Sequence, residues 1–118
     1  MPSYGFGPRA RLSSRRDFQR VFTEGRKIAG RNIILWFRGS GRAFPARLGL
    51  AVSSRVGGAV LRNRLKRLTR EAFRSHRPRL RPGNDLVVYL RAGCRWQGLE
   101  GARRDLLELC GKAGLLVT

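Results

Sequence analysis

Apolar residues recur at a helical spacing in the middle of the chain, over residues 57–74. The recurring positions are Leu61, Leu65, Leu68 and Ala72. Their intervals of four, three and four positions are the period of a helix that packs one side on a core. The pattern therefore predicts an amphipathic helix with this stripe buried.

A second, shorter helix is predicted over residues 15–24, where Phe18 and Phe22 lie four positions apart on one face. It is bounded by the N-cap Ser14, with Asp17 as a capping-box partner, and by the stop Gly25. Such a phenylalanine pair either fills a core or lines a cleft in which bases stack, and the spacing alone leaves both interpretations open.

Four strands are predicted from apolar runs at residues 26–30, 32–38, 47–53 and 85–91. Turn residues at 39–42 predict an antiparallel hairpin between the second and third strands. A last helix is predicted from Leu99 to near Gly111 or Gly114, and Trp96 before it is expected to plug the core. The order α-β-β-β-α-β-α predicts an α+β sandwich with one sheet. We expect a single domain over residues 12–118, after a flexible basic arm at 1–11.

The net charge of +19, from 26 basic and 7 acidic residues, predicts a polyanionic partner. All but three of the basic residues are arginine, and arginine matches phosphate because its planar fork donates two parallel hydrogen bonds. No apolar run is long enough to span a membrane, and no signal-type segment precedes the first helix. We therefore expect a soluble cytoplasmic protein that binds nucleic acid and not a membrane.

Catalytic chemistry by the protein alone is not expected. The seven acidic residues are scattered singly, whereas two-metal nuclease sites need clustered carboxylates. Cys94, Cys110 and His76 lack the spacing of a zinc site, and we expect the two cysteines to be reduced structural thiols. The sequence predicts no metal, no cofactor and no small-molecule substrate for the isolated chain.

The central helix carries its positive charge on the side opposite the leucine stripe. Arg62, Lys66 and Arg70 form one row at intervals of four, an arrangement that destabilises an isolated helix. A polyanion laid along the row would relieve this repulsion. A glycine-rich entry at Gly57 and Gly58 suits a phosphate at the helix N-terminus, although its spacing matches no phosphate-binding fingerprint.

The stretch RLGLAVSSRVGGAVLRNRLKRLTREAFR, which begins at Arg47, resembles the signature of the bacterial ribonuclease P protein component. The most specific part is the triplet of Arg62, Asn63 and Arg64 inside a basic helix. The resemblance covers about residues 11–117. It implies a ribosomal protein S5 domain 2-like sandwich, with the basic helix in a left-handed βαβ crossover. Two positions depart from the family pattern: Ser54 stands where lysine is usual, and Gly58 where asparagine is frequent.

The resemblance also implies a function. The family's protein binds a large catalytic RNA, and the two together cut precursor transfer RNA to leave a mature 5′ end. The RNA performs the hydrolysis with Mg²⁺, and the protein holds the single-stranded 5′ leader in a cleft between the first helix and the sheet. The implied partners are therefore ribonuclease P RNA and precursor transfer RNA, and the implied activity is that of an accessory subunit of an endoribonuclease.

Residues of this chain are assigned to two sites by that resemblance. The RNA-binding set is Arg55, Arg62, Asn63, Arg64, Lys66, Arg67, Arg70 and Arg74. The leader-binding set is Phe18, Phe22, Trp36, Ser53 and Ser54. The alternative function is a structural RNA-binding protein of ribosomal type, which shares the charge but needs no aromatic cleft. A stand-alone nuclease would need the clustered acids that the chain lacks, and a helix-turn-helix protein would need a helix where the 47–53 strand is predicted.

Overall fold

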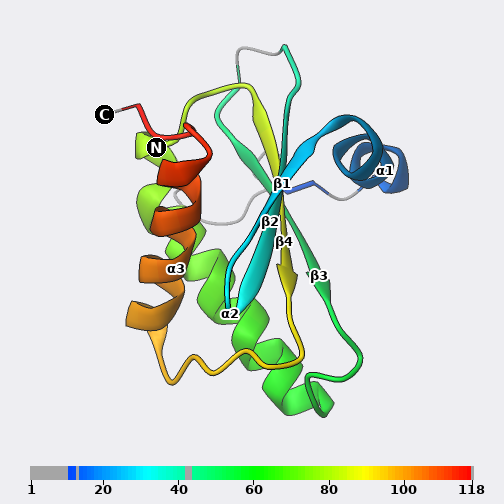
Figure 1. Cartoon of the computed structure of the whole chain (residues 1–118), viewed down its shortest axis with the longest axis vertical. Helices are drawn as coiled ribbons and strands as arrows, with labels where there is room; N and C mark the ends of the chain where they lie inside the picture. The colour runs from blue at the N-terminus through cyan, green and yellow to red at the C-terminus, as the bar shows by residue number, and fades with distance from the viewer. Residues whose placement is uncertain (1–10, 13, 42–43, 118) are drawn as a thin grey trace.

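The computed structural model describes residues 11–12, 14–41 and 44–117, and these form three α-helices and one four-stranded sheet (Figure 1). The helices are α1 (Arg15–Glu24), α2 (Ala59–His76) and α3 (Leu99–Lys112), and a short 3₁₀ turn, η2 (Arg77–Arg79), follows α2. The strands are β1 (Arg26–Ala29), β2 (Ile33–Gly39), β3 (Arg47–Val52) and β4 (Asn84–Leu90). The predicted α+β class and element order are confirmed. The predicted arm lies outside the described residues except for Arg11, which forms a β-bridge with Leu48.

The sheet has the strand order β1-β2-β4-β3, so the predicted hairpin between β2 and β3 is wrong. β4 lies between these strands, antiparallel to β2 and parallel to β3. The connection after β2 is held beside the start of β4, because the Ser40 amide donates to the Gly83 carbonyl and the Gly83 amide donates to the Phe44 carbonyl, each at 2.6 Å. The turn residues therefore carry the chain past β4. β3, α2 and β4 form the predicted βαβ crossover.

α2 and α3 lie on one face of the sheet, and α1 lies on the other (Figure 1). The main core is between the sheet and the α2–α3 layer, where alternate strand residues such as Ile33, Leu35 and Val88 meet Leu65 and Phe73 of α2. A smaller cluster under α1 contains Leu12, Val21 and Val87. The two faces thus differ in the depth of their apolar packing. None of the helices in the described part of the chain is both long and apolar enough to cross a bilayer.

The buried side of α2 differs in part from the predicted stripe. Leu65 and Ala72 are buried and Leu68 is half-buried, as expected, but Leu61 is 39% exposed. The first turn of α2 projects past the end of the sheet (Figure 1), so no strand covers Leu61. Thr69 and Phe73 are buried instead. The Thr69 hydroxyl donates to the Leu65 carbonyl at 2.9 Å, which satisfies its polar group inside the core.

α1 begins and ends where the sequence predicts, but its predicted capping box does not form. Ser14 occupies the N-cap position with an extended backbone, yet its side chain makes no capping hydrogen bond. Asp17 instead pairs with Arg47 of β3 at 3.6 Å. At the other end, a Cβ added to Gly25 would lie 2.5 Å from the Phe37 carbonyl oxygen, so only glycine fits there. Asp17 therefore attaches α1 to the sheet and does not close its own first turn.

Trp96 fills the core near the start of α3, as predicted. Its indole Nε1 donates to Asp105 Oδ2 at 2.7 Å, and Asn32 Nδ2 donates to the same oxygen at 2.7 Å. The Asn32 side-chain oxygen in turn accepts the Arg95 amide at 2.9 Å. This network fixes the loop between β4 and α3, so the largest core side chain in that loop also has its polar atom satisfied.

Candidate nucleic-acid interface

Three aromatic rings lie in a row where α1 meets the sheet. The rings of Phe18 and Phe22 are 6.4 Å apart, and Phe22 meets Trp36 edge to face with centroids 5.0 Å apart and planes at 80°. Phe22 is 36% exposed, and Phe18 and Trp36 are half-buried. Lys27 Nζ lies 5.2 Å from the Trp36 ring centroid, a cation–π distance. The predicted aromatic set is therefore contiguous, and it has a cation at its border.

Phe18 can lie close to the sheet because β3 has a glycine beneath it. A Cβ added to Gly49 would be only 2.6 Å from Phe18 Cζ. An isolated glycine inside a strand often marks such a close approach, and this signal in the RLGLAV run could have been read from the sequence. Gly49 thereby sets the depth at which α1 sits on the sheet.

Two ion-pair groups also hold α1 in place. Arg47 donates two hydrogen bonds to Asp85, from Nε to Oδ1 at 2.8 Å and from NH2 to Oδ2 at 2.9 Å, and Asp85 is only 3% exposed. The same guanidinium reaches Asp17 of α1 from NH1. At the other end of α1, Glu24 pairs with Arg38 of β2 at 3.4 Å. The hydrogen-bonded Asp85 carboxylate raises the pKa of Arg47 above its usual value, so the guanidinium of this clamp stays protonated throughout the physiological range.

The other end of the same sheet face is open and hollow. Ser53, Ser54 and Arg55 follow β3 there and line a cavity of about 690 Å³. Its other lining residues are Ile34, Val52, Tyr89, Arg91 and Ala92. The Ser53 hydroxyl accepts the Arg55 amide at 3.2 Å, which turns the chain away from the strand. This cavity has no carboxylate in its lining and presents two arginines.

α2 carries a row of cations without acidic partners. In the described part of the chain, Arg62, Lys66, Arg67 and Arg70 have no carboxylate within ion-pair distance. Arg64 donates to the Gln97 carbonyl, and Arg74 pairs with Glu71 at 2.6 Å, so these two are partly engaged within the fold. Asn63 is exposed between Arg62 and Arg64. The predicted cost of the like-charge row is thus present in the folded protein.

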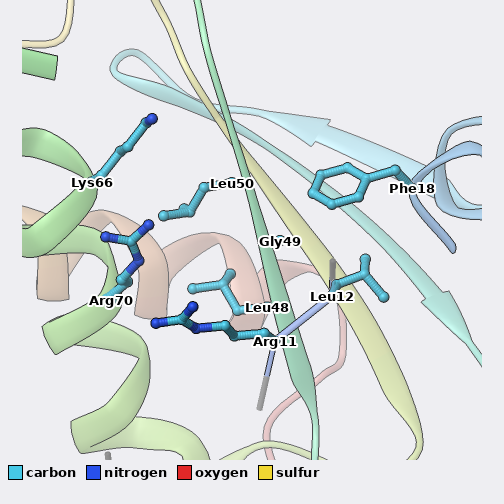
Figure 2. Close-up of a pocket in the computed structure, with 8 residues that line it drawn as sticks. All are labelled: Arg11, Leu12, Phe18, Leu48, Gly49, Leu50, Lys66 and Arg70. Atoms are coloured by element: carbon cyan, nitrogen blue, oxygen red, sulfur yellow. The ribbon is translucent and has the colours of Figure 1, made fainter. Parts of the chain in front are cut away.

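Phe18 of the aromatic group and two cations of the α2 row meet at the outer edge of β3, beside the bridge that Arg11 makes to Leu48. A cavity of about 170 Å³ there is lined by Phe18 and Leu12 on one side of the strand, and by Lys66 and Arg70 of α2 on the other (Figure 2). Arg11 extends into the same region from the segment before α1 (Figure 2). Three cations therefore surround one small cavity whose floor is the apolar edge of β3. The sequence did not predict a role for Arg11.

The acidic residues serve the fold. Six of the seven take part in ion pairs: Asp17, Glu24, Glu71, Asp85, Asp105 and Glu108. No group of three histidine, cysteine, aspartate or glutamate side chains within the described residues is placed to hold a metal ion. Burial raises the pKa of Cys110 to about 12, so its thiol is held in the unreactive protonated form.

The structure divides the predicted site residues among three places. Phe18, Phe22 and Trp36 form the aromatic group, whereas Ser53, Ser54 and Arg55 line the open cavity on the same face. The other predicted RNA-binding residues, from Arg62 to Arg74, lie on α2 across the sheet. Sequence reasoning missed Arg11, Tyr89 and Arg91 as lining residues, because only the strand register shows which of them face the same side.

Comparison with known proteins gives a consistent match. The sequence model described as Ribonuclease P matches residues 6–114. The chain is 40% identical over 106 residues to the ribonuclease P protein component of Shouchella clausii, a match that covers 90% of this chain and 87% of that protein. It is 34% identical over 119 residues to the ribonuclease P protein component of Dictyoglomus turgidum, covering 98% of each.

Solved structures of the same kind have the same fold. The RNase P protein of Staphylococcus aureus superposes with a TM-score of 0.81 at 28% identity, covering 91% of this chain and 97% of that one. The RNase P protein of Thermotoga maritima superposes with a TM-score of 0.74 at 33% identity, covering 86% of this chain and 96% of that one.

Proposed function

Because the chain belongs to the ribonuclease P protein component family, we propose that it is the protein subunit of a ribonuclease P that removes the 5′ leader from precursor transfer RNA. Its partners in this proposal are the catalytic RNA and the precursor. The RNA performs the hydrolysis with its own Mg²⁺, and the protein contributes binding. No step is assigned to a metal held by the protein, since six of its seven acidic side chains are engaged in ion pairs. A cytoplasmic location is part of the proposal.

The cationic row of α2 is the proposed contact with the catalytic RNA. Its unpaired charges repel one another in the free protein, and RNA phosphates would replace that repulsion with attraction. Three of the four unpaired cations in the row are arginines: Arg62, Arg67 and Arg70. A guanidinium can donate two parallel hydrogen bonds to two oxygens of one phosphate. With a net charge of +19, the protein also lowers the repulsion between the two RNAs that it brings together.

The aromatic group of Phe18, Phe22 and Trp36 is the proposed leader site. Stacking on aromatic faces tolerates any base, which suits leaders of differing sequence. The adjacent Lys27 and the cavity with Ser53, Ser54 and Arg55 offer cation and hydroxyl contacts to the phosphate backbone. The observation that carries the proposal is the junction at the β3 edge, where Phe18 of the aromatic group lines one cavity with Lys66 and Arg70 of α2 (Figure 2). A single RNA path could therefore contact both.

The experiment is a titration of reconstituted holoenzyme, made with a bacterial ribonuclease P RNA at low Mg²⁺, with precursor and with mature transfer RNA. We expect Phe22→Leu and Trp36→Leu to weaken precursor binding about 5- to 150-fold, corresponding to the roughly 1–3 kcal/mol of one stacked base. Binding of mature transfer RNA should not change. Phe44→Leu is the matched control, because Phe44 is a 56% exposed aromatic in the loop before β3.

Thermal melts of each variant separate binding from folding. Equal losses for precursor and mature RNA would return the aromatic group to a purely structural role. In that case a structural RNA-binding protein of ribosomal type becomes the better description. Metal-dependent cleavage of precursor by the protein without RNA would contradict the assignment of catalysis to the RNA.

A further inference from the structure

Tyr89 occupies the open part of the sheet face on which α1 lies. Residues two apart on a strand share a face, so Tyr89 is on the side of Val87, which packs in the small cluster under α1. The register places Tyr89 between Ile34 of β2 and Ala51 of β3. Tyr89 is only half-buried, unlike Val87. An aromatic side chain is thus available next to the aromatic group but outside the cover of α1.

The neighbours of Tyr89 leave room for a ligand. On the β3 side, Ala51 and then Ser53 are small, and the cavity of about 690 Å³ opens where a larger side chain would have covered the ring. Tyr89 lines this cavity together with Ile34 and the serine pair. The volume is several times that of the cavity at the β3 edge, which is about 170 Å³. The space is large enough for a planar base.

The charge around the cavity selects the kind of occupant. Arg55 and Arg91 both line it, and no acidic residue does. Both arginines are exposed, and Arg91 is held in place because its Nη1 donates to the Gly30 carbonyl at 2.8 Å. An aromatic floor with a cationic rim is the arrangement that binds single-stranded nucleic acid, since bases stack on the ring and phosphates meet the cations.

Strand geometry connects this cavity to the aromatic group. Trp36 is directly opposite Val87 in the register of β2 and β4, so Tyr89 is its diagonal neighbour. Diagonal neighbours in an antiparallel pair are about 7–8 Å apart and remain within reach of aromatic side chains. The two aromatic residues are therefore diagonal neighbours on one face of the sheet, a spacing that consecutive nucleotides can reach.

We propose that Tyr89 is a further base-stacking residue beyond the aromatic group, which binds a nucleotide of the single-stranded leader adjacent to the one on Trp36. The proposal rests on the function proposed above and extends its leader site toward Arg55 and Arg91. It assigns to Tyr89 a role beyond packing against Ile34. It also implies that the leader runs across the sheet from the α1 border to the end of β3.

The test uses reconstituted holoenzyme and precursors with leaders from zero to about ten nucleotides. Tyr89→Ile introduces a β-branched apolar side chain that suits a strand but removes the π-face. We expect it to weaken binding about tenfold, as for one stacked base, and only above a threshold leader length. Trp36→Leu should show a threshold that differs by about one nucleotide. Tyr89→Phe should bind like the wild type, and Phe44→Ile is the matched control elsewhere on the surface.

A second measurement reads leader stacking position by position, beginning with the wild-type holoenzyme. The fluorescence of 2-aminopurine, placed at successive leader positions, should be quenched by the wild-type holoenzyme at two adjacent positions. Tyr89→Phe should retain both, and Tyr89→Ile should release one of them.

Quenching at a single position would overturn the proposal for Tyr89, and so would equal weakening of precursor and mature transfer RNA by Tyr89→Ile. If either result were found but Trp36→Leu still abolished the preference for leader-bearing RNA, the proposed function would stand without the role of Tyr89. A wild-type holoenzyme that does not prefer leader-bearing RNA would overturn both proposals.

Discussion

On the sheet face that α2 and α3 cover, Ile33, Leu35 and Val88 are fully buried, whereas their strand neighbours Ile34, Trp36 and Tyr89 on the other face are only half-buried. The same strands thus present a dry core on one side and a partly open surface on the other. The two faces also differ in how their covering helices are held. α2 and α3 are held by apolar contacts, but α1 depends on a small cluster, two ion-pair groups and the close approach at Gly49.

This difference indicates a division of tasks between the faces. The covered face provides most of the apolar burial, which is the dominant stabilising term in folding. The open face can therefore keep aromatic rings exposed to solvent without losing the fold. We expect substitutions on the covered face to change stability, and substitutions on the open face to change binding.

The largest expected effect comes from a matched pair of phenylalanines. Phe73→Ala removes a fully buried ring from the covered face and should lower the free energy of unfolding by about 3–5 kcal/mol. Phe22→Ala removes a ring that is 36% exposed on the open face and should lower it by about 1–2 kcal/mol. Denaturant unfolding of both variants measures the difference. Equal losses of unfolding free energy would mean that Phe22 stabilises the fold as much as a fully buried core residue does.

The next effect tests the clamp under α1. Asp85→Asn leaves the Arg47 guanidinium without its buried carboxylate and should lower the free energy of unfolding by about 3 kcal/mol. Asp17→Asn breaks a longer and more exposed pair and should lower it by less than about 1 kcal/mol. The double replacement Arg47→Met with Asp85→Leu should recover most of the loss, since the only charge left without its partner is the more exposed Asp17 carboxylate. A double variant as unstable as Asp85→Asn would contradict this account.

The third prediction concerns salt dependence and compares an unpaired with a paired cation. Arg67→Ala should reduce the slope of log affinity for the catalytic RNA against log salt concentration by about one, because one phosphate contact is lost. Lys112→Ala should leave the slope unchanged, because Lys112 pairs with Glu108 at 3.1 Å on α3. Titrations at several salt concentrations measure both slopes. An unchanged slope in Arg67→Ala would mean that the α2 row is only solvated.

The smallest effect concerns charge within the helical layer. Burial, together with Arg79 and Arg103, lowers the pKa of His76 at the end of α2. A histidine with a lowered folded-state pKa binds protons more readily when unfolded, so its contribution to stability is present above about pH 6.5 and is lost as the pH falls. The wild type should therefore lose more stability between about pH 7.5 and pH 5.5 than His76→Gln. Identical pH profiles would show that His76 titrates as in water.

Sequence signals within each segment predicted the helices and strands well. They did not predict which strands pair, because strand pairing depends on residues far apart in the sequence. The predicted bounds of α1 are those of the structure: Ser14 stands at the N-cap position with an extended backbone, and the Gly25 amide closes the last turn on the Val21 carbonyl. The predicted hairpin between β2 and β3 was wrong although residues 39–41 have the composition of a hairpin turn. The strand that lies between β2 and β3 is β4, which begins only at Asn84. Nothing near the turn encodes that insertion. It depends on hydrogen bonds to Gly83, more than forty positions along the chain.

The site shows the same limit. The resemblance assigned Phe18, Phe22 and Trp36 together, and their rings are contiguous in the structure. Tyr89 could not be placed beside them from its own strand, because both sides of that strand are apolar and only the register with Ile34 shows its face. Leu61 was misplaced for the opposite reason, since the helical period continues past the point where the sheet ends.

The position of β4 has a consequence for how the protein is made. Both of its neighbours are synthesised earlier. The edges of β2 and β3 that pair with β4 therefore stay without a partner strand until β4 has left the ribosome. α2 is complete before that moment, with its cations in place but no finished sheet to pack on. Long-range pairing of this kind slows folding and prolongs the exposure of unpaired strands. A nascent chain halted before Asn84 would thus carry the basic helix without the fold, and RNA could reach it before the protein is closed.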